Sequence, residues 1–251
     1  MNSAVISSII FVSIFAAALM GMAVRRVLPE DHVGSDPKEV VRLANGLVVT
    51  MAALVLGMLV SSGKSFYDAR KNEVAELSSE IVNIDQTLAR YGPETGEIRA
   101  EFGQMVQAGL DRVWPSESSR PPELRPKNYG EVALGQLEQL TPKNDAQAAI
   151  KAQALSMISV FRQTQWLLFV RLRQNAVPLP LLEVLVSWLV FIFVSFGLFA
   201  RPNSTVIVML ALSAIAVSSA IFIILEMYKP FNGVLRISPT PILDALSELS
   251  H

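Results

Sequence analysis

The chain of 251 residues contains no cysteine and only two histidines, His32 and His251. Without cysteine, disulfide bonds, thiol nucleophiles and thiolate metal sites are excluded, whereas the redox compartment stays open because such a chain is stable in either environment. One histidine falls in an expected loop and the other is the last residue, so neither a zinc site nor a histidine general base is expected. The sequence therefore predicts neither a metal nor a cofactor.

Basic charge and catalytic motifs are also lacking. The formal net charge is −1 and charged residues make up 17% of the chain, so no basic surface for nucleic acid is indicated. The sequence has no glycine-rich phosphate loop, no GxSxG serine elbow and no pair of carboxylates with a histidine. We expect that the protein is not an enzyme and does not bind nucleic acid.

Charged residues are nearly missing from four long apolar stretches. The first two have none, the third has Glu183 near its start, and the fourth has Glu226 near its end. At 1.5 Å per residue each stretch is about 28 Å or longer, close to the roughly 30 Å of a bilayer core. A signal peptide is the alternative for the first stretch, but the basic start is missing and the run exceeds the usual 7–15 or so residues. The stretches cover residues 4–24, 43–61, 181–200 and 205–227.

The polar segment between the second and third stretches has the periodicity of helices. Its apolar residues recur three and four positions apart, which indicates amphipathic helices, and no strand pattern occurs. Thr141 followed by Pro142 predicts the start of the last helix in this segment. The expected helices cover residues 65–91, 94–113, 129–140 and 141–175, and prolines make 114–128 a loop.

These observations predict an all-α integral membrane protein with two spans, an inserted helical domain and two more spans. The third and fourth spans form a tight hairpin because only four residues, Arg201 to Ser204, connect them. The tail contains a short amphipathic helix from Thr240, which we place either on the inserted domain or at the lipid interface. The expected parts are spans one and two (1–62), the inserted domain (63–177), spans three and four (178–228) and the tail (229–251).

Lysine and arginine near the span ends predict the orientation. More of them lie on the inner side if the amino terminus is cytoplasmic, although Arg25 and Arg26 favour the opposite direction. We therefore expect both termini and the inserted domain in the cytoplasm. The inner set is then Lys64, Arg70, Lys71, Arg162, Arg171, Arg173, Lys229 and Arg236, and the outer set is Arg25, Arg26, Lys38, Arg42 and Arg201.

Segments at both ends of the chain carry a family resemblance. Residues 195–206, 220–227, 229–233 and 236–238, together with 67–71 after the second span, resemble the bacterial bestrophin-like domain family. That family is named for a suggested distant relation to bestrophins, which are pentameric anion channels with four spans and a cytosolic domain after the second. The resemblance implies a homo-oligomer, with five subunits by analogy, in the bacterial inner membrane, with an anion as the permeant species. The hydrophobic gate motif of animal bestrophins is not found, so the resemblance assigns no gate residue.

The second span carries a stripe of small or hydroxylated residues at steps of three and four, and Lys64 extends it. Such a stripe either lines a water-filled path between subunits or lets helices approach closely, and the sequence leaves both readings open. Asn45, at the start of this span, is either a polar constriction or the donor of a bond between helices. The candidate pore-lining residues are Asn45, Gly46, Thr50, Ala53, Gly57, Ser61 and Lys64.

Two carboxylates lie near span ends, Glu183 and Glu226. A carboxylate in an apolar span is costly, so each should face protein or water, and the expected partner of Glu226 is either Lys229 or a cation of the inserted domain. Ion or proton binding is the functional alternative for both residues.

Two functions remain from the sequence. The first is a homo-oligomeric ion channel, with anions favoured. The second is a non-conducting membrane scaffold or sensor whose helical domain binds a partner through the stripe from Val74 to Leu88.

Overall fold

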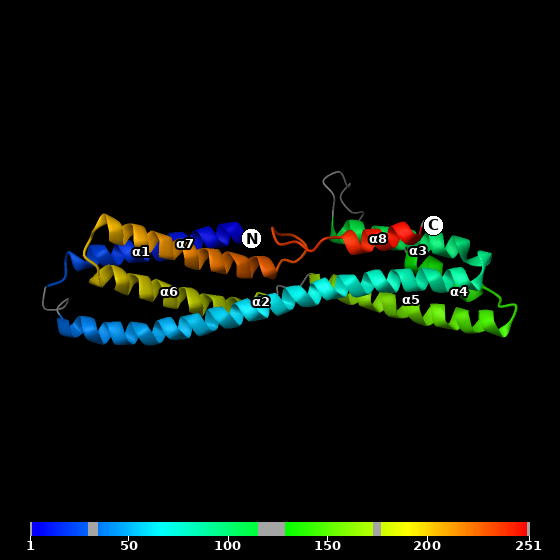
Figure 1. Cartoon of the computed structure of the whole chain (residues 1–251), viewed down its shortest axis with the longest axis horizontal. Coiled ribbons are helices and arrows are strands. Elements are labelled where there is room, and N and C mark those ends of the chain that lie inside the picture. The colour runs from blue at the N-terminus through cyan, green and yellow to red at the C-terminus, as the bar shows by residue number, and fades with distance from the viewer. Residues whose placement is uncertain (1, 30–34, 115–128, 173–176, 250–251) are drawn as a thin grey trace. The chain divides into compact units, whose positions relative to one another are not determined.

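The computed structural model describes residues 2–29, 35–114, 129–172 and 177–249. Within these ranges the chain folds into helices and contains no strand (Figure 1), so the all-α prediction is confirmed. His32, His251 and nearly all of the expected loop at 114–128 lie outside the described residues.

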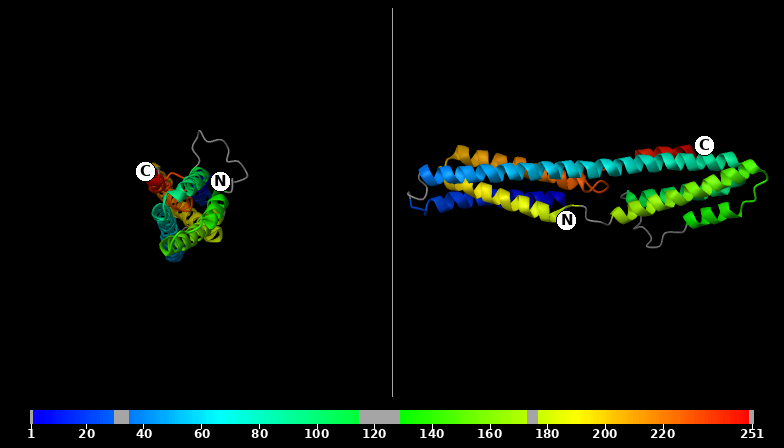
Figure 2. Two further views of the ribbon diagram at one scale, coloured as in Figure 1. Left: turned by 90° about the vertical axis from the view of Figure 1, so that its right-hand side faces the viewer. Right: turned by 90° about the horizontal axis from the view of Figure 1, so that it is seen from below.

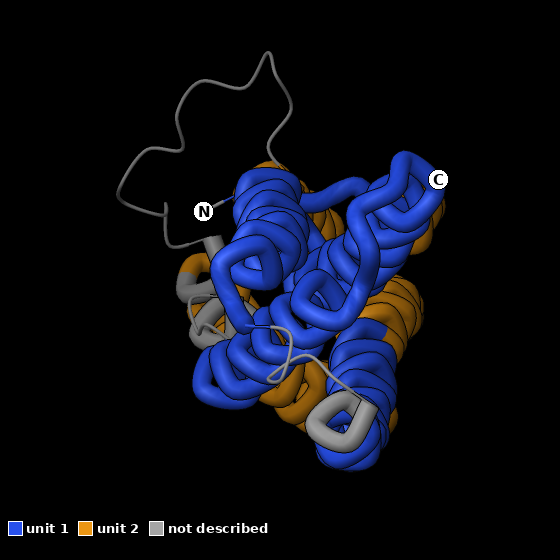
Figure 3. The backbone as a smooth tube through the Cα atoms, turned by 90° about the vertical axis from the view of Figure 1, so that its left-hand side faces the viewer, with its two compact units in different colours: residues 1–67, 176–235 blue, residues 68–175, 236–251 orange. Residues whose placement is uncertain are grey.

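The chain divides into two compact units, which Figure 3 distinguishes by colour. Unit 1 consists of Met1–Tyr67 and Ala176–Leu235, and unit 2 consists of Asp68–Asn175 and Arg236–His251. One helix, α2 (Ser35–Tyr91), runs without a break from the first unit into the second.

Unit 1 contains four helices that are long and apolar enough to cross a membrane: α1 (Ser3–Arg25), the first part of α2, α6 (Leu179–Phe199) and α7 (Ser204–Met227). They lie side by side in the views of Figures 1 and 2. Asn203 accepts a hydrogen bond from the Thr205 amide and caps α7.

Helices α1 and α6 approach closely where they cross at Gly21 and Gly197. A Cβ atom on Gly197 would lie 1.9 Å from the Ala18 carbonyl oxygen, and one on Gly21 would lie 2.2 Å from the Val194 oxygen. Both distances are far inside van der Waals contact. Glycine at these two positions therefore lets the backbones approach closely, which is the usual source of helix association in a membrane.

Unit 2 contains the second part of α2 together with η2 (Pro93–Thr95), α3 (Gly96–Val113), α4 (Tyr129–Gln139), α5 (Asp145–Leu172) and α8 (Thr240–Leu249). The two apolar stripes expected from the sequence form its core, and Phe102 packs edge-on against Phe161 of α5. Each of their members is at most 8% exposed: Val74, Leu77, Ile81, Ile84, Leu88, Ile98, Phe102, Met105, Val106 and Leu110.

The chain reverses after α2 at Gly92, whose φ of 135° lies in the region that favours glycine. The buried Thr95 hydroxyl donates to the Leu88 carbonyl at 2.7 Å and closes this turn. The expected start of α5 at Thr141-Pro142 is wrong, because the helix begins at Asp145. Asn144 supplies the cap, since its side chain accepts the Gln147 amide at 2.8 Å.

Charged pairs join the helices of unit 2. Asp85, which is 6% exposed, accepts two hydrogen bonds from Arg99 of α3, at 2.6 and 2.8 Å. This two-bond geometry raises the pKa of Arg99 and satisfies a carboxylate that would be costly to bury alone. Lys151 donates to the Glu138 and Leu140 carbonyls at 2.7 and 2.8 Å and so neutralises the carboxyl end of α4.

The tail returns to unit 2 and packs on its helices. The Trp114 indole donates to the Ile237 carbonyl at 2.9 Å, and Ser78 of α2 donates to the Pro241 carbonyl at 2.6 Å. Ile242 and Ala245 of α8 are buried. Of the two placements left open by the sequence, the structure has the tail on the helical domain.

Candidate functional site

One face of α2 packs into the core of unit 1. Asn45, Ala52 and Leu59 are at most 7% exposed, and Gly63 is buried below them. These positions recur at steps of seven and four, which is the period of one helix face. The bundle therefore covers α2 along a narrow line and leaves the rest of the helix exposed.

The stripe of small residues lies on the exposed part of α2. Of the four candidate spans, α2 is the least covered, with 17% of its most apolar window buried against 22–39% for the others. A Cβ atom added at Gly46 or Gly57 would meet nothing within 4 Å. Close packing inside unit 1 thus does not explain these glycines, in contrast to Gly21 and Gly197. The exposed members are Gly46, Thr50, Ala53, Gly57 and Ser61, with Lys64 also exposed.

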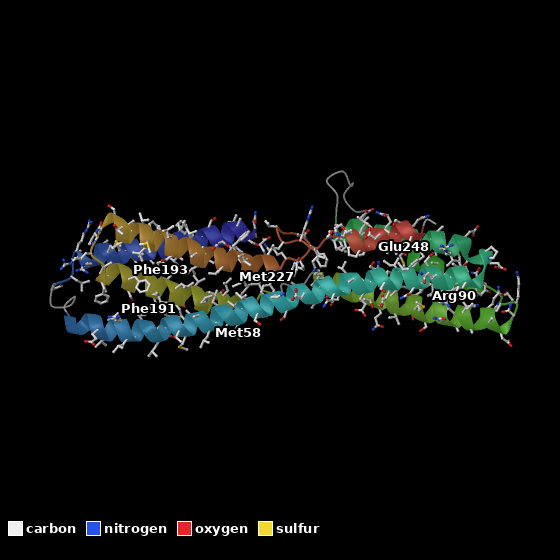
Figure 4. The ribbon with its side chains drawn as sticks, in the orientation of Figure 1. Met58, Arg90, Phe191, Phe193, Met227 and Glu248 are labelled. Atoms are coloured by element: carbon white, nitrogen blue, oxygen red, sulfur yellow. The ribbon has the colours of Figure 1, made fainter. Side chains whose placement is uncertain are left out.

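Large apolar side chains flank the stripe. On one side, Leu54 is 69% exposed and Met58, labelled in Figure 4, is 54% exposed, and on the other side Val49 is 40% exposed. Within the stripe, the Thr50 hydroxyl donates to the Gly46 carbonyl at 2.8 Å, so its hydrogen bond is made inside the helix. The exposed surface of α2 is therefore a shallow line of small residues between apolar ridges.

Asn45 does not lie with the stripe. It is next to Gly46 in sequence, but successive residues are about 100° apart on a helix, and this turns Asn45 toward the core. Its side chain is 7% exposed and its Oδ1 accepts no hydrogen bond within the described part of the chain.

Glu226 is buried at the carboxyl end of α7, at 3% exposure, and one carboxylate oxygen accepts the Val234 amide. Gly233 allows this approach, because a Cβ there would lie 2.4 Å from that oxygen. The contact closes the turn that contains Lys229. Glu183, the other candidate carboxylate, is exposed in the second turn of α6.

A contact between α2 and the end of α7 was not anticipated from the sequence. Tyr228 donates a hydrogen bond to Ser62 at 3.0 Å, and its ring lies 5.4 Å from that of Phe66. Tyr228 and Ser62, which form the hydrogen bond, are 166 positions apart in the sequence, and nothing in their local sequence patterns indicates the pairing. Among the described residues, no group of three or more His, Cys, Asp or Glu side chains could hold a metal ion.

The fold defines an all-helical protein with four candidate membrane spans and a small-residue line on the exposed face of the second. The family model for the bestrophin-like domain matches residues 11–242, and the chain belongs to this family. A comparison with curated proteins finds no match.

A solved structure also resembles the chain. It is the crystal structure of a mutated bacterial bestrophin homolog from Klebsiella pneumoniae, with a TM-score of 0.63 and 12% sequence identity. The similarity covers 96% of this chain and 97% of the other. At this identity the comparison shows a shared fold.

Proposed function

We propose that this bestrophin-like protein is a homo-oligomeric channel in which the α2 helices of several subunits surround an axis and turn their small-residue stripes toward it. The observation that carries the proposal is the exposure of Gly46 and Gly57, which no residue of their own unit approaches. Small side chains leave room for water along the axis, while the apolar ridges beside them suit contact with neighbouring subunits or lipid.

Membership in the bestrophin-like family supports the channel. Five subunits and a preference for anions are what the resemblance to bestrophins implies, and we include both in the proposal. Lys64 follows the stripe and would raise the local concentration of anions at one mouth of the path. Asp68 lies one turn after Lys64 and carries the opposite charge. The path therefore prefers anions only if Lys64 lies closer than Asp68 to its narrow part. We propose that the protein lies in a bacterial inner membrane with unit 2 and both termini on the cytoplasmic side, as the distribution of lysine and arginine favours.

The scaffold or sensor alternative loses the surface on which it was based. The stripe from Val74 to Leu88 forms the core of unit 2 and is at most 5% exposed, so a partner has no access to it.

Anion flux into liposomes that contain the purified protein tests the proposal. We expect chloride-dependent currents that Gly57→Leu reduces at least tenfold, because four added carbons per subunit would enter the path. Ala44→Leu is the matched control, since Ala44 is also exposed on α2 but lies on the opposite side of the helix from Gly57. Absence of current from a well-folded oligomer, or equal effects of the two variants, would contradict the proposal.

Oligomeric state in detergent is the second test. Native mass spectrometry should give a complex of four or more subunits, and five is the expected number. A stable monomer would rule out a path built from α2, because one four-helix bundle has no room for a channel beside its own packing.

Selectivity can be tested with two single charges. Lys64→Gln should lower the ratio of chloride to sodium permeability, whereas Asp68→Asn should raise it. Both effects should weaken at high salt, because ions screen charges at a water-filled mouth. Changes in the same direction for both variants would show that these charges do not set the selectivity.

A further inference from the structure

A pocket of 270 Å³ opens on the surface of unit 1 where α6 ends and α7 begins. Its apolar border is exposed, with Phe196 at 45% and Met209 at 58%. The residues that line it include Phe196, Ala200, Thr205, Val206, Met209 and Ser213.

The interior of this pocket suits a hydrocarbon chain. Ser213 is the lining residue farthest along α7 from the connection, and its hydroxyl donates to the Met209 carbonyl at 2.9 Å, so its hydrogen is already used. The other lining side chains, apart from Thr205 at the first turn of α7, are apolar. Both helices are candidate spans, so an exposed pocket between them would face lipid chains, with the connection nearer the head groups.

The connection beside the pocket carries one cation. Ala200 and Thr205 line the pocket, and the connection between them contains Arg201, the only charged residue in the sequence between Glu183 and Glu226. The start of α7 adds partial positive charge and the end of α6 adds partial negative charge, so Arg201 supplies the net charge at this place. At the same end of the bundle, Arg25 of α1 donates to the Leu198 carbonyl at 3.4 Å.

We propose that this pocket binds an anionic phospholipid, with one acyl chain between α6 and α7 and the phosphate at Arg201. An apolar slot with a single cation at its rim is complementary to a lipid, which joins a charged head to an apolar chain. A helix from a second copy of the chain would fill the slot but would leave Arg201 without an anion. The inference is independent of conduction, because it concerns binding alone.

Native mass spectrometry of the full-length protein in detergent tests the site by titration with phosphatidylglycerol and phosphatidylcholine. The wild type should retain phosphatidylglycerol about fivefold better, the factor that one cation near a membrane surface contributes. Arg201→Gln should abolish this preference but still retain both lipids. Arg42→Gln, at an exposed arginine of α2, is the control and should keep the preference.

The acyl-chain pocket is tested with a second pair of variants. Ser213→Phe fills the pocket and should reduce retention of both lipids, whereas Leu212→Phe changes an exposed neighbour outside the lining and should not. Equal retention of the two lipids by the wild type would overturn the proposal, as would an unchanged preference in Arg201→Gln. Loss of subunits from the oligomer in Ser213→Phe would also overturn it, since the pocket would then be a contact between copies of the chain.

Discussion

The phenol of Tyr228, directly after α7, donates a hydrogen bond to the Ser62 hydroxyl of α2 at an oxygen–oxygen distance of 3.0 Å. Gly63 follows Ser62, and a Cβ atom added there would lie 3.4 Å from the Tyr228 ring, at the short end of ordinary van der Waals contact. Phe66 packs against the same ring. The end of the fourth candidate span is thus bound to α2 directly beyond Ser61, the last residue of the stripe.

Tyr228→Phe should remove this hydrogen bond and keep the ring contact. The expected loss of stability is about 0.5–1.5 kcal/mol, the usual net contribution of one hydrogen bond. Thermal unfolding in detergent measures the effect, with Ser62→Ala and the double variant completing a cycle. If both single variants lose stability because this one hydrogen bond is broken, the double variant should be no less stable than the less stable single variant. Additive losses would show that the two residues act separately.

The contact of Glu226 with Val234 predicts a difference between two substitutions. Glu226→Gln keeps an acceptor oxygen for the Val234 amide, whereas Glu226→Ala removes the buried acceptor and leaves the amide of the exposed Val234 to water. We expect the alanine variant to lose about 1.5–3 kcal/mol of stability, the usual contribution of a hydrogen bond to a charged group, and the glutamine variant to lose less. Limited proteolysis of the segment after α7 should detect the loosened turn. Equal cleavage of the two variants would contradict this role.

Gly233→Ala tests the same turn from the other side. An added Cβ would lie 2.4 Å from the Glu226 oxygen, so the carboxylate or the turn must move. Cleavage after α7 should increase as it does in Glu226→Ala. Gly135→Ala in α4 is the control, because a Cβ there meets nothing within 4 Å.

The crossing of α1 and α6 should tolerate no side chain. Gly197→Ala would place a carbon 1.9 Å from the Ala18 oxygen and force the helices apart, so we expect loss of the folded protein from detergent extracts. Gly46→Ala adds the same atom where nothing lies within 4 Å. It should leave thermal stability unchanged or raise it by up to about 1 kcal/mol, since alanine is the better helix former. Size-exclusion profiles and melting curves distinguish the two outcomes.

Local patterns predicted much of the fold because they depend only on helix period. Val74, Leu77 and Ile81 are spaced for one helix face, and any partner that covers this face buries all of them. The start of α5 was predicted wrongly, because two caps compete in the sequence. A proline at the first helical position favours Thr141 as the cap, but the Asn144 side chain caps the helix three residues later.

From the sequence, the candidate site could be predicted only as a stripe of small residues along one face of a helix. The spacing of Gly46, Thr50 and Gly57 gives a shared face, but whether that face is covered depends on where the other spans lie. The contact of Ser62 with Tyr228 joins residues 166 positions apart, and such a pairing has no local signature. Asn45 was predicted as a pore-lining candidate because it is polar and lies at the start of the span, but the helix turns it and Gly46 toward different surroundings.

Glu80 of α2 predicts a pH dependence of stability. Partial burial, and to a smaller extent the nearby Glu76, raise the pKa of Glu80 in the folded protein, and its covered Oε2 has no hydrogen-bond partner in the described chain. A carboxyl whose pKa is raised by folding binds its proton more tightly in the folded state. Stability should therefore fall as the pH rises from the ordinary glutamate pKa through the raised value.

Glu80→Gln should remove this penalty. The variant should melt higher than the wild type at pH 7.5, and the difference should shrink toward about pH 3, below the ordinary glutamate pKa, where Glu80 is protonated in both states. The gain should be small because the residue is partly exposed and solvent screens its charge. Glu97→Gln, at an exposed glutamate of α3, separates this effect from a general change in net charge. A melting difference between wild type and Glu80→Gln that is the same at both pH values would mean that ionisation of Glu80 does not contribute to stability.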